Sequence, residues 1–98
     1  MRLEEKVYKK LLSVPPSKVT TYSELAKAVG LKNGQRVIGR IMNKNPYPVI
    51  IPCHRVIKSD GSIGGYAWGE KVKTNMLSKE GVEIKKGKII DKNAIYRF

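Results

Sequence analysis

Residues 21–44 read TYSELAKAVGLKNGQRVIGRIMNK, and this stretch decides the fold. Thr21 is followed three residues later by Glu24, which is the spacing of a capping box at the start of a helix. Gly30 is expected to end that helix, because glycine readily adopts the left-handed conformation that closes helices. Asn33 is expected to cap a further helix soon afterwards. The short turn between the two helices predicts a helix-turn-helix.

The second of these helices is predicted over about residues 34–44 and has two unlike faces. Its apolar residues share one side, which we expect to meet the core: Val37, Ile38, Ile41 and Met42. Arg36, Arg40 and Lys44 are spaced four residues apart and form a basic stripe on the other side. Such a stripe is often only a solvated surface, but together with the turn and the cap it favours recognition of nucleic acid.

The charge of the whole chain points the same way. Its 98 residues include 20 Lys and Arg against 8 Asp and Glu, which gives a net charge of +12. An excess this large on a small protein indicates a polyanionic partner, with nucleic acid first and an anionic membrane surface second. The alternative is a Lys-rich composition without such a partner, as occurs in some thermophile proteins.

Length and patterning predict a single domain over residues 1–98 that is mainly α-helical with short β-hairpins, an α+β fold. Further helices are expected over residues 3–13 and 70–80. No run approaches the roughly 20 apolar residues that span a bilayer, and the N-terminus has no secretory pattern. We therefore expect a soluble cytoplasmic protein without membrane contact.

Two hairpins are predicted, and the first would form a wing beside the helix-turn-helix. It pairs residues 55–57 with residues 63–66 around Asp60-Gly61. The second is a weaker hairpin within residues 82–90 that turns at Lys86-Gly87. The predicted architecture is therefore a winged helix-turn-helix.

The loop over residues 45–52 cannot be helical, because it holds three prolines. Its apolar run Val49-Ile50-Ile51 predicts that the middle of the loop is buried. The loop leads into Cys53 and His54, the single cysteine and the single histidine of the chain. A disulfide within the chain is thus impossible, and a Cys/His zinc site would lack ligands. Cys53 is therefore either an inert buried thiol or a reactive one.

His54 supports the reactive interpretation of Cys53. A thiol must become a thiolate to attack carbon, and an imidazole can take its proton. Adjacent side chains rarely face each other, so a bridging water or a tight turn is needed to couple the two groups. A third group should orient the imidazole, and spacing alone leaves Glu80, Glu70 and Asp60 as candidates.

Residues 45–57, NPYPVIIPCHRVI, resemble the active-site signature of the O6-alkylguanine-DNA alkyltransferases. The family pattern continues in the right order with TYSELA at residues 21–26, RVIG at 36–39, GGY at 64–66 and LSKEG at 77–81. The resemblance covers roughly residues 3–81. Many members of that family carry an additional N-terminal domain, and we expect this chain to do without it.

The resemblance implies single-use DNA repair. Proteins of this family bind duplex DNA through the helix-turn-helix in the minor groove, flip the damaged nucleotide out and take its O6-alkyl group onto a cysteine. It implies that Cys53 is the acceptor, that His54 is the base through a water, and that Glu80 orients His54. No cofactor or metal is implied, because the nucleophile is itself the acceptor. The implied partner is double-stranded DNA containing O6-alkylguanine, bound by a monomer.

The resemblance also assigns roles around Cys53. Tyr22 would rotate the nucleotide and hydrogen-bond the flipped guanine, Arg36 would fill the gap in the base stack, and Asn45 would hold the turn after the recognition helix. The residues expected to line the pocket are Val56, Gly65, Tyr66, Ala67 and Trp68. The residues expected to contact DNA are Tyr22, Gln35, Arg36, Arg40 and Lys44. Arg55 is expected to be structural, held by a carboxylate or by carbonyl groups.

Two residues depart from the family pattern, and two alternative functions stay open. Trp68 stands where many relatives have glycine, so its indole is expected to exclude large O6 adducts, and Arg40 stands where relatives often have a small residue. One alternative is an alkyltransferase-like sensor, which binds the lesion without repairing it and commonly has tryptophan in place of Cys53. The other is a plain winged-helix regulator, which would leave unexplained Asn45, the proline-rich approach and the loop over residues 64–67, the glycine loop.

Overall fold

The computed structural model describes residues 2–45, 47, 50–66 and 68–98. The elements follow in the order α1 (Leu3–Leu12), β1 (Thr20–Thr21), α2 (Tyr22–Ala28), α3 (Gln35–Asn43), the 3-10 helix η1 (Cys53–Arg55), β2 (Val56–Ile57), α4 (Glu70–Lys79), β3 (Ile84–Lys85), β4 (Lys88–Ile89) and the 3-10 helix η2 (Lys92–Ala94). This is the predicted α+β class. Within these residues no helix combines the length and the apolar character needed to cross a membrane.

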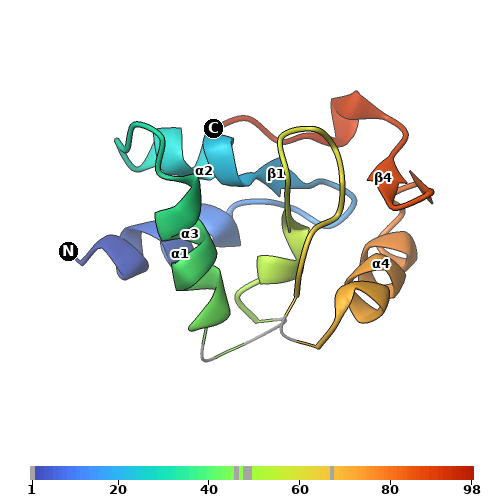
Figure 1. Ribbon diagram of the computed structural model, residues 1–98, viewed down its shortest axis with the longest axis horizontal. Helices are drawn as coiled ribbons and strands as arrows, with labels where there is room; N and C mark the ends of the chain where they lie inside the picture. Colours follow the sequence, from blue (N-terminus) through green and yellow to red (C-terminus); the bar gives the residue numbers. More distant parts are fainter. Residues whose placement is uncertain (1, 46, 48–49, 67) are drawn as a thin grey trace.

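The helices α1, α2 and α3 pack together on one side of the molecule (Figure 1). Their buried residues form one cluster, to which α1 contributes Val7 and Leu11 and α2 contributes Leu25 and Ala26. The apolar face of α3 meets this cluster, as the sequence pattern predicts. Ile38, Ile41 and Met42 are buried and Val37 packs against them from a half-buried position. Arg36, Arg40 and Lys44 are exposed, so the basic stripe lies in solvent.

Only the first of the two predicted helix caps forms. The Thr21 hydroxyl accepts a hydrogen bond from the backbone N–H of Glu24 at 3.0 Å, so Thr21 caps α2. The prediction for Asn33 is wrong, because Asn33 has a left-handed φ of 50° and Gly34 occupies the cap position of α3. Gly34 is required there by space, since a Cβ would lie 2.7 Å from the Cβ of Leu31.

The first predicted hairpin is wrong. Val56 and Ile57 in β2 pair in parallel with β1, in the register Thr20 to Val56 and Thr21 to Ile57. The turn at Asp60-Gly61 does form, with Lys58 N–H donating to the Ser62 carbonyl at 3.0 Å, but the chain after it runs along the C-terminal hairpin. Val56 and Ile57 are both fully buried, and strands covered on both faces commonly pair in parallel.

The second hairpin is confirmed. β3 and β4 are antiparallel, with Ile84 opposite Ile89 and Lys85 opposite Lys88. The two residues at the tip, Lys86 and Gly87, have φ values of 52° and 75°. Positive φ at both positions is the requirement of a type I′ turn, which matches the right-handed twist of the strands.

The strand β2 separates two apolar clusters and contributes to both. Val56 belongs to the helical cluster, whereas Ile57 belongs to a second cluster under α4 and the hairpin. The second cluster consists of Val19, Ile57, Ile63, Leu77, Val82 and Ile89. The C-terminal segment extends the pairing of β1, because Val19 N–H donates to the Ala94 carbonyl and Tyr96 N–H donates to the Val19 carbonyl. The residues around Cys53 thus lie between two packed cores.

The cap of α2 can be tested at Thr21. Thr21→Val keeps the shape of the side chain but removes the acceptor for Glu24 N–H, so the free energy of unfolding should fall by about 1 kcal/mol in urea denaturation. Thr21→Ser is the matched control, because it keeps the acceptor and loses only a methyl group. A valine variant more stable than the serine variant would mean that the side-chain shape matters and the cap does not.

Candidate active site

Two consecutive tight turns present Cys53. Pro52 has φ −79° and ψ 65°, and the backbone N–H of Cys53 donates to the Ile51 carbonyl at 2.7 Å, which is the geometry of an inverse γ-turn. The 3-10 helix η1 follows at once, with Arg55 N–H donating to the Pro52 carbonyl at 3.0 Å. Proline suits the first turn because its ring fixes φ near this value. Cys53 itself is buried, with 6% of its surface exposed.

Asn45 secures the loop that leads into these turns. Its side-chain amide donates to the Ile51 carbonyl at 2.9 Å, and its side-chain oxygen accepts from Tyr47 N–H at 2.9 Å. The Ile51 carbonyl therefore accepts hydrogen bonds from both Asn45 and Cys53. The predicted burial of the loop at its middle is wrong for Ile50, which is 74% exposed, while Val49 lies outside the described residues. Ile51 is half-buried and packs against the helical cluster, so packing at Ile51 and the hydrogen bonds of Asn45 both hold the end of the loop.

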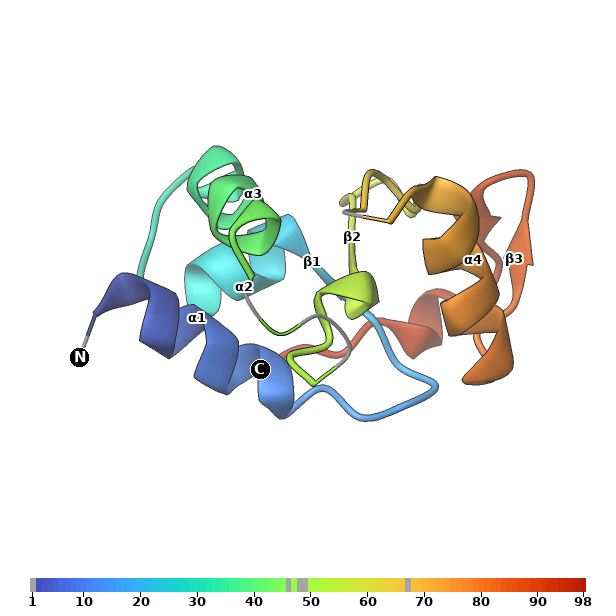
Figure 2. The ribbon, with the colours of Figure 1, turned by 90° about the horizontal axis from the view of Figure 1, so that it is seen from below.

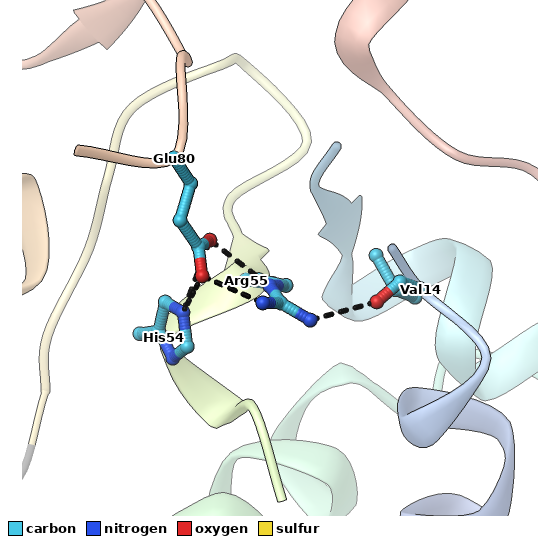
Figure 3. Close-up of polar contacts among 4 residues, drawn as sticks. All are labelled: Val14, His54, Arg55 and Glu80. Carbon is cyan, nitrogen blue, oxygen red and sulfur yellow. Dashed lines mark hydrogen bonds and ion pairs between the residues drawn. The ribbon is translucent and has the colours of Figure 1, made fainter. Parts of the chain in front are cut away.

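The imidazole of His54 points at the carboxylate of Glu80 (Figure 3). Its Nε2 lies 3.2 Å from both carboxylate oxygens, and its side chain is 1% exposed. Since a carboxylate accepts, Nε2 carries the hydrogen and Nδ1 presents a lone pair. Nδ1 is buried and has no hydrogen-bond partner among the residues described. Of the three orienting groups that spacing allowed, the structure brings Glu80 to His54.

Arg55 holds the same carboxylate from the other side. Its Nε donates to Glu80 Oε1 at 3.0 Å and its Nη2 donates to Oε2 at 2.6 Å, while its Nη1 donates to the Val14 carbonyl at 2.9 Å (Figure 3). Glu80 is the cap residue at the end of α4, and Val14 follows α1. Arg55 therefore joins η1 to the ends of α1 and α4, which is the structural role that the family resemblance suggested.

Burial keeps His54 neutral. Burial lowers the pKa of His54 below its ordinary 6.5, and this outweighs the opposing pull of Glu80. Partial burial of Glu80 opposes its ionisation, but the hydrogen bonds from Arg55 and His54 prevail and lower its pKa below 4.5. Glu80 is therefore an anion already balanced by Arg55, so it orients the imidazole without fixing a proton on Nδ1. A neutral imidazole of this kind can accept a proton.

Two tyrosines, Tyr22 and Tyr66, lie near enough to Cys53 for its charge to act on their hydroxyls. Burial, followed by the nearby Cys53, raises the pKa of Tyr22 above 10 and that of Tyr66 to about 12. Both hydroxyls thus stay protonated. Tyr66 lies edge-on to His54 with ring centroids 6.5 Å apart, and Trp68 stands edge-on to Tyr66 at 5.8 Å. Trp68 is 54% exposed, so its indole stands at the outer end of this aromatic row.

The remaining predicted pocket and DNA-contact residues have different surroundings. Val56 is fully buried and Gly65 is exposed, while Ala67 lies outside the described residues. Gln35 turns toward α2, where its amide donates to the Ser23 hydroxyl at 3.1 Å. The structure carries no DNA, so the contacts expected of Arg36, Arg40 and Lys44 stay predictions.

The sequence interpretation missed Lys73, whose side chain is fully buried. Its ammonium donates to the Val56 carbonyl at 2.6 Å and to the Gly65 carbonyl at 3.1 Å, so it ties β2 to the glycine loop. Burial lowers its pKa from 10.5 to about 8. The signal was present, because Lys73 precedes Leu77 by four residues and therefore shares the inward face of α4.

Comparison with known proteins places this geometry in a family. Residues 2–82 match the sequence model of the 6-O-methylguanine DNA methyltransferase DNA-binding domain. The methylated-DNA–protein-cysteine methyltransferase of Pyrobaculum aerophilum is 49% identical over 71 residues, covering 72% of this chain and 47% of that protein. The chain belongs to the 6-O-methylguanine DNA methyltransferase family. It spans about half or less of the length of the curated relatives it matches.

Solved structures support the same assignment. The O6-methylguanine-DNA methyltransferase of Pyrococcus kodakaraensis superposes with a TM-score of 0.75 and 43% identity, over 84% of this chain and 47% of that one. Schizosaccharomyces pombe Atl1, crystallised with damaged DNA containing O6-carboxymethylguanine, superposes with a TM-score of 0.84 and 31% identity, over 99% of both chains. The structural likeness therefore extends both to a methyltransferase and to Atl1.

The buried charge of Lys73 predicts a pH dependence of stability. Between pH 8 and 10.5 the folded protein has released this proton and the unfolded chain still holds it, so the free energy of unfolding rises with pH in that window. Lys73→Met removes the titration. The difference in stability between wild type and variant should therefore shift in favour of wild type by up to about 3 kcal/mol across the window.

The measurement is urea unfolding of both proteins at several pH values across that range. Taking the difference cancels the titration of the other lysines and tyrosines, which both proteins share. A difference that stays constant with pH would contradict the assignment of a buried, charged Lys73.

Proposed function

We propose that this chain repairs DNA by moving an alkyl group from the O6 atom of guanine to the sulfur of Cys53. The observation that carries the proposal is the buried Cys53 beside His54, whose Nε2 lies 3.2 Å from both oxygens of Glu80. A nucleophile, a base and an orienting carboxylate are the parts that thiolate chemistry needs. Membership of the methyltransferase family supports the same conclusion.

The reaction balances without a cofactor. His54 Nδ1 takes the thiol proton of Cys53 through a bridging water, and the sulfur attacks the O6 alkyl carbon. The S–C bond forms as the C–O6 bond breaks, and the electron pair stays on the guanine, which takes up the proton. The product is a thioether, which has no route to hydrolysis, so one protein molecule repairs one lesion.

Residues outside the Cys53–His54–Glu80 set would bring the damaged guanine to Cys53. The stripe on α3 would hold double-stranded DNA from the minor groove, with Arg36 filling the place of the flipped nucleotide. Tyr22 would help rotate the nucleotide and donate its protonated hydroxyl to the guanine. Asn45 would keep Cys53 in line by holding Ile51, to which it donates at 2.9 Å. The protein would act as a monomer in the cytoplasm.

A second candidate is a sensor that binds the alkylated base without repairing it. The observation that favours it is the match to Atl1 over 99% of both chains, in a complex with damaged DNA. Cys53 favours repair, because it supplies the alkyl acceptor in a site where His54 and Glu80 are arranged to activate it. The two candidates differ in one covalent bond, which can be measured directly.

The expected outcome of incubation with a duplex containing O6-methylguanine is a mass gain equal to one methylene unit on the Cys53 peptide. The reaction should stop at one equivalent, because the thioether is not turned over. Intact-protein and peptide mass spectrometry report both values. Cys53→Ser is the control, and it should bind the duplex without gaining mass. Retained binding with no gain by the wild type would favour the sensor.

Trp68 should limit the size of the alkyl group. Its indole stands at the edge of Tyr66 and is half exposed, so Trp68→Gly opens the outer end of the aromatic row. We expect the variant to take up a benzyl group roughly tenfold faster, a change of about 1.4 kcal/mol in the barrier, with little change for methyl. Trp68→Phe keeps the bulk and should behave like wild type. Equal acceleration of both lesions would contradict a steric role.

A further inference from the structure

We propose that the tip of the β3–β4 hairpin is a second DNA-backbone contact, separate from α3. The tip is residues 84–88, IKKGK, which contain three lysines and no carboxylate. They lie beyond residues 2–82, the part that matches the family. The inference rests on the proposed function only in that the ligand is duplex DNA; it makes no use of the chemistry at Cys53.

The hairpin tip is anchored to the turn over residues 58–63. The Ile63 N–H donates to the Gly87 carbonyl and the Ile89 N–H donates to the Gly61 carbonyl, both at 3.0 Å. Ser62 and Lys88 form an antiparallel bridge between these bonds. Ile89 is buried in the second apolar cluster, so the hairpin is held by packing as well. The lysines of the tip therefore sit on a supported frame.

The same turn is bonded to the start of the recognition helix. The hydroxyls of Ser59 and Ser23 are 2.8 Å apart, and the Gln35 amide donates to the Ser23 hydroxyl at 3.1 Å. A continuous polar connection thus runs from the first residue of α3 to the turn beside the hairpin. Figure 2 shows the start of α3, the loop over residues 58–66 and the hairpin in a row along one edge of the molecule.

The turn over residues 58–63 and the hairpin tip carry exposed lysines. Lys58, Lys85, Lys86 and Lys88 are all exposed, and within the described chain none of them lies within ion-pair distance of a carboxylate. Asp60 in the turn is hydrogen-bonded to Ser62, and these bonds, followed by the nearby Lys88 and Lys58, lower its pKa, so one carboxylate offsets part of the positive charge. Arg36, exposed in the first turn of α3, adds a cation at the other end of the edge.

The dimensions fit one duplex. The longest extent of the molecule is 36 Å, which corresponds to about ten base pairs of B-DNA. A duplex held by α3 can therefore present phosphates to the hairpin without bending around the protein. Phosphate contacts carry no sequence information, so the hairpin would add affinity and fix orientation.

Lys86 gives a second indication of function. It occupies a left-handed position with a φ of 52°, where asparagine and glycine are the favoured residues of a type I′ turn. A lysine there is unfavourable for the turn and is consistent with selection for its charge. Lys86→Asn should therefore keep or raise the Tm, so a loss of DNA binding in this variant cannot be attributed to unfolding.

The test is the salt dependence of binding to an undamaged duplex of about 20 base pairs, long enough to cover the whole edge. Lys86→Asn should lower the slope of log K against log salt by about 0.9, and the triple variant Lys85→Gln, Lys86→Asn, Lys88→Gln by about 2 to 3. At roughly 0.1 M salt, each lost contact should weaken binding up to about eightfold.

The matched control is Lys6→Gln, Lys9→Gln, Lys10→Gln, which removes the same charge from exposed positions of α1. Figure 2 shows α1 away from the edge that holds the hairpin. The control variant should leave the slope nearly unchanged. Equal loss in both triple variants would show that only bulk charge matters, and no loss in the hairpin variant would also overturn the proposal. In either case, wild-type binding and methyl uptake by Cys53 would leave the proposed function standing, whereas a wild type that binds no DNA would defeat both.

Discussion

The ion pair between Arg55 and Glu80 is the constraint on which the rest of the site depends. Glu80 ends α4, Arg55 lies in η1, and the third bond of the guanidinium reaches the Val14 carbonyl after α1, so one side chain fixes three elements that are distant in sequence. The same pair sets the electrostatics of His54. A carboxylate already balanced by a cation can orient an imidazole while burial keeps it neutral. Loss of Arg55 would thus disturb position and protonation together.

Around this pair, the nucleophile occupies an unusual place in the packing. Cys53 belongs to the helical cluster, while β2, three residues later, also enters the cluster under α4. Lys73 crosses this boundary with its ammonium bonded to carbonyls of β2 and of the glycine loop. The two sides of the site are thereby attached to different apolar clusters: Cys53 to the helical cluster, and the end of β2 to the cluster under α4. Such an arrangement favours preorganisation, because neither side can move without disturbing packed residues.

The local patterns of the sequence predicted local structure well. The cap at Thr21, the two faces of α3, and the tip at Lys86-Gly87 all depend on neighbours within a few residues. Two local predictions were wrong, the cap at Asn33 and the burial of Ile50, and the larger error concerns partners distant in sequence. Val56 and Ile57 were assigned to a hairpin because the turn at Asp60 suits one, but their buried partners are Thr20 and Thr21. Spacing alone left Glu80 level with Glu70 and Asp60; the family resemblance favoured Glu80, and the structure brings Glu80 to His54.

The parallel pairing of β1 and β2 has a mechanical consequence. Thr21 is at once the last residue of β1 and the cap of α2, and Val56 follows η1 without a linker. The pairing of β1 with β2 therefore leaves no flexible segment between the first turn of α2 and the turn that holds Cys53. A tilt of those helices on a bound surface would carry the sulfur with it as one rigid piece.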